Sequence, residues 1–132
     1  MLTDLAITDC LESNVNELPA EYRNKCDLLA YNWAETEVPS VLLGKNWDCI
    51  ICSDILYEEK SHDLLLGLLK KLTFKKLFLS YKRRNDEAEL HFFENLELLF
   101  SVTEIDPATF PRINLCDEVI AAGLHLLVVT MK

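Results

Sequence analysis

Three short apolar runs in this sequence each end in side chains that could hold a ligand. The runs lie in "MLTDL", "LLAYNW" and "WDCIICSDILYEE", and the residues at their ends are Asp4, Asn32, Trp33, Ser53, Asp54 and Tyr57. Carboxylate, amide and hydroxyl groups bind ligands through hydrogen bonds. Runs of this length are typical of buried strands, and open parallel sheets bind ligands beyond the carboxyl ends of their strands. The sequence therefore predicts a binding site at these three strand ends.

The aspartates of this set also have a simpler explanation. Asp is favoured at the N-cap of a helix, where its carboxylate accepts hydrogen bonds from free backbone N–H groups. Asp4 or Asp9 would then cap the first expected helix. Asp54 would cap the helix that begins near Glu58 or Ser61. The residue types alone leave both explanations open.

Alternating strands and helices must position these residues. Apolar residues recur at helical spacing in 6–18, 61–72 and 86–100, and the last helix is expected to bury Leu90, Phe93, Leu96 and Phe100. Strands are expected in "MLTDL" and at 26–31, 47–53, 77–81, 101–105 and 124–131, and the run 49–52 should be buried on both faces. Segments 38–46 and 106–122 read as loops, the first with a helical turn.

This alternation predicts an α/β fold with three layers and a mostly parallel sheet. Segments 47–53 and 77–81 are expected to be adjacent parallel strands. The last two strands, 101–105 and 124–131, have no obvious crossover helix between them, so they should pair antiparallel and give the sheet an antiparallel edge strand. The 132 residues contain no repeat and no linker, which suggests a single domain over 1–132.

The balance of charge excludes some partners. The chain has 13 basic and 22 acidic residues, a net charge of −9. Nucleic-acid backbones and anionic membranes need a basic face, so neither is expected as a partner. A cationic partner, such as a lysine-rich protein segment or a positively charged cofactor, is compatible with this charge. No apolar run approaches the roughly 20 residues of a membrane span, and the N-terminus lacks the pattern of a signal peptide.

The five cysteines indicate a reducing compartment. Their number is odd and they fall in apolar segments, so free thiols in the core of a cytoplasmic protein are expected. Cys49 and Cys52 form a C-x-x-C motif, but residues three apart on a strand point to opposite faces. No second pair of Cys or His at ligand spacing completes a zinc site, so no metal is expected.

The order of the motifs resembles a known family. A strand ending in "TDL" precedes a helix with "ESNVNEL", a second strand ends at "NW", and a third ends in the D-x-x-Y motif from Asp54 to Tyr57. A fourth strand runs into "FLSYKRRNDEAELHFFENL", where a Tyr and an Arg precede a helix with paired Phe. In these features the chain is similar to the class I, seven-strand, S-adenosylmethionine-dependent methyltransferases of the lysine-methyltransferase-like subgroup. The resemblance implies a Rossmann-like methyltransferase fold.

The resemblance also implies roles for the residues at the strand ends. Asp4 would accept hydrogen bonds from the ribose hydroxyls of S-adenosylmethionine, Trp33 would stack on the adenine and Asn32 would bond its edge; without the resemblance, Trp33 would be as well explained as a core aromatic. Ser53 would join the cofactor site. Two further residues, Asp54 and Tyr57, would hold the amine of a lysine from a protein substrate by hydrogen bonds.

The chain departs from this family at one important motif. The family's first strand and its Gly-rich turn should precede "MLTDL", but the chain begins there and its three glycines are scattered. By the usual strand order, the missing strand belongs at the sheet centre, where its absence exposes two unpaired strand edges. The chain would then be the C-terminal part of the full fold, or a partner chain or a rearranged strand order would fill the gap. A second hypothesis is a non-catalytic, methyltransferase-like binding module or subunit.

Overall fold

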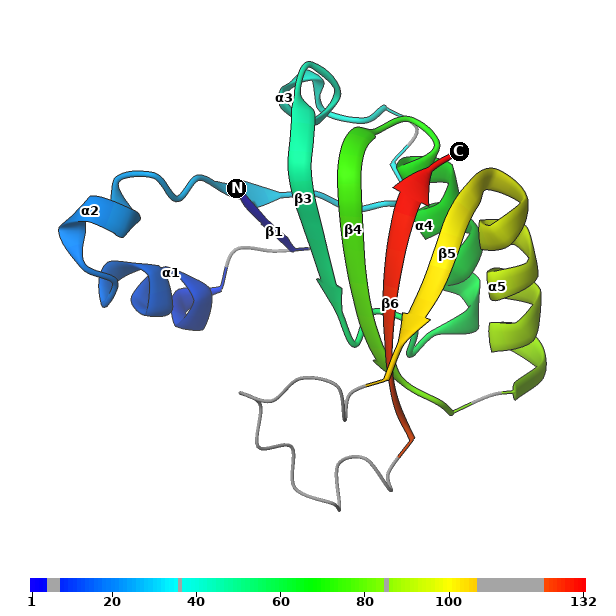
Figure 1. Cartoon of the computed structure of the whole chain (residues 1–132). Helices are drawn as coiled ribbons and strands as arrows, with labels where there is room; N and C mark the ends of the chain where they lie inside the picture. Colours follow the sequence, from blue (N-terminus) through cyan, green and yellow to red (C-terminus); the bar gives the residue numbers. More distant parts are fainter. Residues whose placement is uncertain (5–7, 36, 85, 107–122) are drawn as a thin grey trace. The chain divides into compact units, whose positions relative to one another are not determined.

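The computed structural model describes residues 1–4, 8–35, 37–84, 86–106 and 123–132. Two compact units make up the chain, Met1–Pro39 and Ser40–Lys132. Each unit has its own sheet, two-stranded in the first and four-stranded in the second (Figure 1). The chain is therefore mixed α/β, as the sequence predicts. A single domain over 1–132 stays a prediction.

The first unit is a pair of parallel strands joined through helices. Strands β1 (Leu2–Asp4) and β2 (Leu28–Ala30) pair with Asp4 opposite Ala30. Between them lie helices α1 (Asp9–Asn16) and α2 (Ala20–Arg23), because parallel neighbours need a crossover connection. Helix α1 begins where it does because the Oγ1 of Thr8, its N-cap, accepts a hydrogen bond from the Leu11 N–H at 3.2 Å. Both strands end at the same edge.

The second unit holds the remaining elements. In chain order they are α3 (Ser40–Leu43), β3 (Asn46–Ser53), the 3₁₀ helix η1 (Glu59–Ser61), α4 (His62–Leu69), β4 (Thr73–Lys82), α5 (Asp86–Leu99), β5 (Phe100–Ile105) and β6 (Leu124–Met131). The strand order is β3-β4-β6-β5. Strands β3 and β4 are parallel, whereas β6 is antiparallel to both β4 and β5, so three of the four strands run in one direction.

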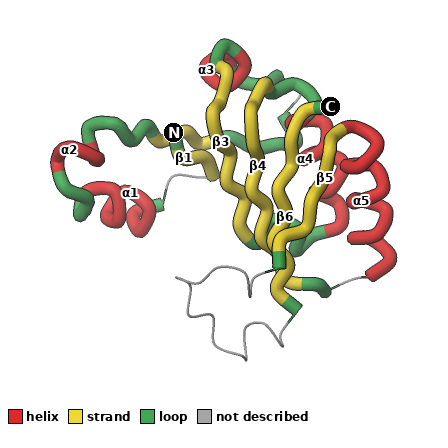
Figure 2. Tube along the Cα trace, in the orientation of Figure 1, coloured by secondary structure: helices red, strands yellow, loops and turns green. Residues whose placement is uncertain are grey.

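The helices α4 and α5 cover one face of this sheet (Figure 2). Alternate residues of β4 point to this face, and Leu77, Leu79 and Tyr81 are all buried there. The ring of Tyr81 lies 4.9 Å from that of Phe93 in α5, and α4 contacts α5. The largest fully buried side chains of the unit, Phe92, Leu77, Leu96 and Val129, form its core.

Several predictions about strand pairing are confirmed. Segments 47–53 and 77–81 lie in adjacent parallel strands, and Ile50 pairs with Leu77 in their register. The last two strands pair antiparallel, so the edge strand β5 has an antiparallel neighbour. The reversed strand itself, however, is β6, and it lies inside the sheet between β4 and β5 rather than at the edge. Because β6 is antiparallel to both of its neighbours, its place between them does not require a crossover helix. Of the predicted loop over 106–122, residues 107–122 lie outside the described residues.

One prediction about burial is wrong, and a second is confirmed only in part. Strand β3 is not buried on both faces, since the side chain of Ile51 is 78% exposed. It pairs only with β4 among the described strands, so it lies at an edge. In α5, Leu96 is buried as expected, and so is Phe100 directly after the helix, whereas Leu90 is 60% exposed and Phe92 lies in the buried stripe. The expected stripe is therefore right toward the end of the helix and wrong at Leu90.

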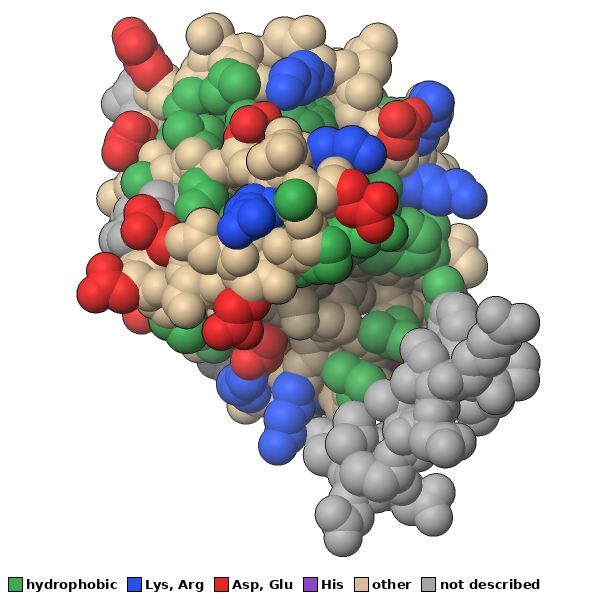
Figure 3. All heavy atoms as spheres, turned by 90° about the vertical axis from the view of Figure 1, so that its left-hand side faces the viewer, with side chains coloured by type: hydrophobic (Ala, Val, Ile, Leu, Met, Phe, Trp, Pro, Cys, Tyr) green, Lys and Arg blue, Asp and Glu red, His purple; other side chains and the backbone are tan. Residues whose placement is uncertain are grey.

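Charged side chains of both signs share the surface. Figure 3 shows Lys and Arg side chains with Asp and Glu side chains among them on the face that it draws. Acidic groups therefore interrupt the basic ones on this face. Within the part of the chain that the structure describes, no helix is long and apolar enough to cross a bilayer.

The assignment of the buried face of α5 predicts different effects for two leucines in that helix. Leu96 is 0% exposed and Leu98 is 74% exposed. Leu96→Ala should lower the free energy of unfolding by about 2–5 kcal/mol, because it leaves a cavity in the core. Leu98→Ala, the matched control, should change it by less than about 0.5 kcal/mol. Urea unfolding followed by circular dichroism measures both, and equal losses would show that the helix face is assigned wrongly.

Candidate functional site

Strands β3 and β4 end together, and their last residues form the base of the candidate site. Ser53 pairs with Ser80, and the Ser80 hydroxyl donates a hydrogen bond to the Ser53 hydroxyl oxygen at 3.1 Å. The next N–H along the chain, that of Asp54, donates to the Ser80 carbonyl at 2.8 Å. The ladder of backbone hydrogen bonds between β3 and β4 therefore continues to Asp54. This last hydrogen bond fixes the position at which the following loop leaves the sheet.

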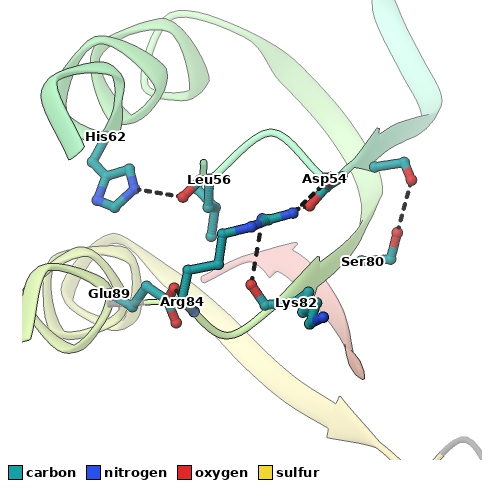
Figure 4. A network of polar contacts seen from close by, with 8 residues as sticks. Asp54, Leu56, His62, Ser80, Lys82, Arg84 and Glu89 are labelled. Carbon is teal, nitrogen blue, oxygen red and sulfur yellow. Dashed lines mark hydrogen bonds and ion pairs between the residues drawn. The ribbon is translucent and has the colours of Figure 1, made fainter. Parts of the chain in front are cut away.

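The Asp54 carboxylate is held by Arg84, which follows β4. The two terminal nitrogens of Arg84 donate to the two carboxylate oxygens, Nη1 to Oδ1 at 2.7 Å and Nη2 to Oδ2 at 2.9 Å (Figure 4). Such a two-pronged pair restricts orientation as well as distance. The side chains are 57% exposed for Asp54 and 39% for Arg84, so the pair lies at the surface.

This contact controls the titration of both groups. The hydrogen bond from Arg84 lowers the pKa of the Asp54 carboxyl below its ordinary value, and the positive charge of Lys82 acts in the same direction. The same hydrogen bond raises the pKa of Arg84. Because the pKa of Asp54 is lowered in the folded state, the pair stabilises the fold above the ordinary pKa of aspartate. This contribution is lost as the pH falls through the lowered pKa.

The backbone at Asp54 has an unusual conformation. Its φ is +53°, and among the described residues it is the only non-glycine residue with a positive φ. Asp tolerates this left-handed region better than most residues, and such conformations are enriched at functional sites. The turn directs the chain away from β3 at once, so the carboxylate projects beyond the sheet edge where Arg84 meets it (Figure 4).

A buried carboxylate in α5 fixes the segment that carries Arg84. Glu89 is only 2% exposed, and its Oε1 accepts a hydrogen bond from the Arg84 backbone N–H at 2.7 Å. Glu89 belongs to the beginning of α5, where the helix dipole favours a negative charge. This hydrogen bond fixes the backbone of Arg84, and therefore the origin of its side chain, relative to α5.

The loop after Asp54 is anchored in its middle and exposed at its end. Leu56 is 3% exposed, and its carbonyl oxygen lies 3.3 Å from Nε2 of His62, which must carry the proton for this hydrogen bond. The His62 imidazole is itself buried and packs on Phe92, with ring centroids 5.2 Å apart. Tyr57 is 67% exposed. The loop is therefore held at Asp54 and Leu56, and the phenol of Tyr57 faces solvent.

A cavity of about 420 Å³ adjoins this loop. It lies between the beginnings of α4 and α5, and its lining includes Glu59, His62, Asp63, Glu87, His91 and Phe92. Neither Asp54 nor Tyr57 lines it. Carboxylates outnumber the one lysine of the lining, Lys60, so the cavity is acidic.

The other predicted site residues belong to the first unit. Asp4 is the last residue of β1, and its carbonyl accepts a hydrogen bond from the Tyr31 N–H at 2.8 Å, directly before Asn32 and Trp33. Asn32 forms a turn in which its Oδ1 accepts the Ala34 N–H at 2.9 Å. The structure thus brings together Asp4, Asn32 and Trp33 in one unit, and Ser53, Asp54 and Tyr57 in the other.

Helix capping does not explain these aspartates. Thr8 caps α1, so neither Asp4 nor Asp9 does so. Helix α4 has Ser61 as its N-cap and η1 has Glu58. The carboxylate of Asp54 binds Arg84 instead.

Sequence reasoning missed two residues of this network. No role was predicted for the basic residues at 82–84, but Arg84 is paired with Asp54. Its position after a strand end was the signal that could have found it. Glu89 gave no such signal, because a charged residue in a helix is normally expected to face solvent.

The thiols form no reactive cluster among the described residues. Cys10, Cys26, Cys49 and Cys52 are free, but the first and third are exposed, so the expectation of core thiols is wrong for these two. Burial raises the pKa of the Cys52 thiol to about 11, which keeps it protonated at neutral pH. Cys116 lies outside the described residues. In the described ranges no three His, Cys, Asp or Glu side chains are grouped so that they could hold a metal ion.

Comparison with known families identifies the class of protein. The model of the lysine methyltransferase family matches residues 1–99, three quarters of the chain, so this chain belongs to that family. The matched region includes all six predicted site residues together with Arg84 and Glu89. The resemblance inferred from the sequence is thereby confirmed. The comparison with curated proteins found no match.

The geometry of the pair predicts how Asp54 titrates in a variant without the guanidinium. Arg84→Met should raise the pKa of Asp54, because the donor that favours the charged carboxylate is removed. NMR titration of the side-chain carboxyl carbons measures this pKa. Asp48 is the internal control, since Lys75 lowers its pKa and is unaffected by the substitution. An Asp54 pKa that is the same in both proteins would contradict the bidentate pair.

Proposed function

We propose that this chain is the substrate-holding part of an S-adenosylmethionine-dependent methyltransferase that modifies a lysine side chain in a protein. Family membership supports the reaction class. The observation that carries the proposal is the loop after β3, in which Asp54 is oriented by Arg84 and the exposed Tyr57 follows three residues later. A carboxylate and a phenol at the end of a parallel strand are suited to holding an amine.

The proposed catalytic residues act by positioning the nucleophile. A lysine must lose its proton before it attacks, which costs about 5 kcal/mol at pH ~7 from an ordinary pKa of about 10.4. Asp54 accepts a hydrogen bond from the amine and Tyr57 offers a second contact, so the nitrogen lone pair is directed along the line of attack. Neither group needs to be a strong base, because displacement by an amine depends mainly on geometry.

The residues at the strand ends suit one half of the cofactor. The carboxylate of Asp4 can accept both ribose hydroxyls, and Trp33 offers a face for adenine. The Oδ1 of Asn32 is engaged by Ala34, which leaves its NH₂ group to donate to an adenine ring nitrogen. Ser53 belongs to the second unit; its oxygen accepts from Ser80, and its own O–H remains able to donate to a ligand. When bound, the cofactor supplies the methyl group from its sulfonium.

The glycines do not suit the other half of the cofactor. A methionine carboxylate is well held by the backbone amides of a glycine-rich turn at a helix N-terminus. Gly67 lies inside α4, Gly44 directly follows α3, and Gly123 precedes β6 with φ +76°. None of the three lies in a turn from a strand into a helix. This half of the cofactor therefore needs a segment other than those described.

We extend the proposal to the complete fold. It would be a three-layer Rossmann-like sheet in which a further strand pairs with the edge of β3 that no described strand occupies. Strand β3 pairs with β4 along one edge, and among the described strands none pairs with the other. A partner chain, or another segment of the same protein, would supply that strand and the glycine-rich turn.

The substrate proposal follows from charge. The net charge of −9 and the acidic cavity beside the loop favour a basic protein segment around the target lysine. They disfavour nucleic acid and anionic membranes. A cytoplasmic location fits the free thiols of the described residues.

The proposed roles predict opposite kinetic effects for two aspartates. In the native protein, isolated with any chain that binds it, Asp54→Asn should lower kcat far more than cofactor affinity, because an amide cannot accept from both guanidinium nitrogens and the acceptor for the amine loses its orientation. Tyr57→Phe should have a milder effect, since it removes one hydroxyl. Asp4→Asn should mainly weaken cofactor binding. Labelled cofactor, candidate substrates and mass spectrometry measure transfer.

Matched controls are available in both units. Asp48→Asn changes another ion-paired aspartate on β3, and Asp27→Asn changes an exposed aspartate just before β2. Both should leave turnover and affinity near those of the wild type. If Asp54→Asn left turnover intact and lowered only the melting temperature, the carboxylate would be structural. A native protein without transfer to any protein would favour the non-catalytic binding module.

The glycine arrangement predicts weak cofactor binding by this chain alone. Loss of the amides that hold the methionine carboxylate should cost about 3–4 kcal/mol, which reduces affinity roughly a hundredfold to a thousandfold. Isothermal titration calorimetry of the 132-residue chain with S-adenosylmethionine measures this affinity. Micromolar binding would contradict the prediction, and adenosine serves as a control for the half of the site that is present.

A further inference from the structure

We propose that Arg84 is a positioning residue that neutralises Asp54, so that the site receives the substrate lysine as a neutral amine rather than as an ammonium ion. The inference rests on the proposed function. It goes beyond it by assigning a task in the reaction to a residue that holds neither cofactor nor substrate.

An unpaired aspartate would work against the reaction in one respect. A carboxylate within about 4–6 Å of an amine favours the ammonium form and moves the pKa of the amine upward by about 1–3 pH units. The ammonium ion has no lone pair and cannot accept a methyl group. An unpaired Asp54 would therefore bind the substrate well and hold it in its unreactive form.

The bidentate contact removes this difficulty without removing the acceptor. The guanidinium brings a full positive charge to within 2.7 and 2.9 Å of the two carboxylate oxygens. Each oxygen has a second lone-pair direction, and the Asp54 side chain is 57% exposed. Asp54 can thus still accept one N–H from a neutral amine, while its charge no longer favours an ammonium ion.

The charges around the pair are balanced. Lys82 in β4 contributes a positive charge near Asp54, and its carbonyl lies 3.5 Å from Nη1 of Arg84. Glu89 in α5 contributes a negative charge near Arg84. With Asp54 and Arg84 these make two positive and two negative groups.

The neighbouring groups do not upset this balance. Arg83 interacts with the side chain of Tyr81, which belongs to the helix-covered face. From α4, His62 donates to the Leu56 carbonyl and packs on Phe92. The charges at the Asp54–Arg84 pair itself therefore offset one another.

The fixed position of Arg84 also argues for a task beyond stability. Exposed ion pairs contribute little to the stability of a fold. Here, however, the segment that carries the guanidinium is tied by its backbone N–H to Glu89, a carboxylate that is buried at 2% exposure. The fold therefore holds this cation in place from inside the protein, although the pair itself is at the surface.

The test is the pH dependence of single-turnover methyl transfer by the native protein with any bound partner retained. The rate should rise with pH as the bound lysine deprotonates. In Arg84→Met and Arg84→Gln this rise should move to higher pH by about one pH unit or more. The rate at neutral pH should then fall about tenfold for each pH unit by which the profile moves, and it should recover at alkaline pH.

Two further variants separate charge from geometry. Arg84→Lys keeps the positive charge but loses the bidentate contact. The pH profile of its single-turnover rate should therefore keep the wild-type midpoint and reach a lower maximal rate. Lys75→Met is the matched control, because it removes the cation of another ion pair between β3 and β4, with Asp48. Its profile should match that of the wild type. Melting temperatures are measured for every variant, so that a loss of fold is recognised.

The outcomes distinguish this inference from the proposed function. Activity in the wild type with profiles of unchanged midpoint in Arg84→Met and Arg84→Gln would overturn the inference alone, because a structural role lowers the rate equally at every pH. The same holds if the profile of Arg84→Lys moves as far as those of the neutral variants. Absence of transfer by the wild-type native protein would overturn both.

Discussion

The parallel pairing of β3 and β4 is the constraint on which the candidate site depends. Because both strands run in the same direction, their carboxyl ends lie at one edge, and residues 30 positions apart in the chain meet there. Asp54 leaves one strand and Arg84 leaves the other. A shift of one residue in the register would move the Ser53–Ser80 contact apart and place the guanidinium away from the carboxylate. The helices that follow each strand then hold the two loops, α4 through His62 and α5 through Glu89.

The network combines a rigid base with an accessible surface. Its buried members, Leu56, His62 and Glu89, make contacts to the backbone and so fix the course of the chain. The side chains that remain exposed are those with chemical capacity, Asp54 and Tyr57. Precise positioning of a reacting group requires such buried supporting contacts, because an exposed side chain without them adopts many conformations.

Local sequence pattern predicted the elements of the fold well and their arrangement less well. The strand ends at Asp4 and Asp54 could be found because apolar runs stop there, and strand-helix alternation implied the parallel pairing of β3 and β4. The insertion of β6 between β4 and β5 could not be found in this way, since strand order depends on long-range packing. The exposure of Leu90 in α5 was misjudged, because the adjacent Phe92 and Phe93 leave open which side chains of the first turns are buried. The role of Arg84 required knowing which strand ends meet, and that of Glu89 required knowing that an acidic residue is buried.

The left-handed backbone at Asp54 limits how this position can change in evolution. Among the two acidic residues, Asp enters this conformation more readily than Glu, whose longer side chain gains nothing from local hydrogen bonding there. Asn and Gly fit the backbone but carry no charge. Substitution by Asn or Gly would therefore preserve the loop conformation but remove the carboxylate. Substitution by Glu would keep a carboxylate but strain the loop. Retaining both leaves aspartate, so the course of the main chain and the ion pair with Arg84 together select this amino acid.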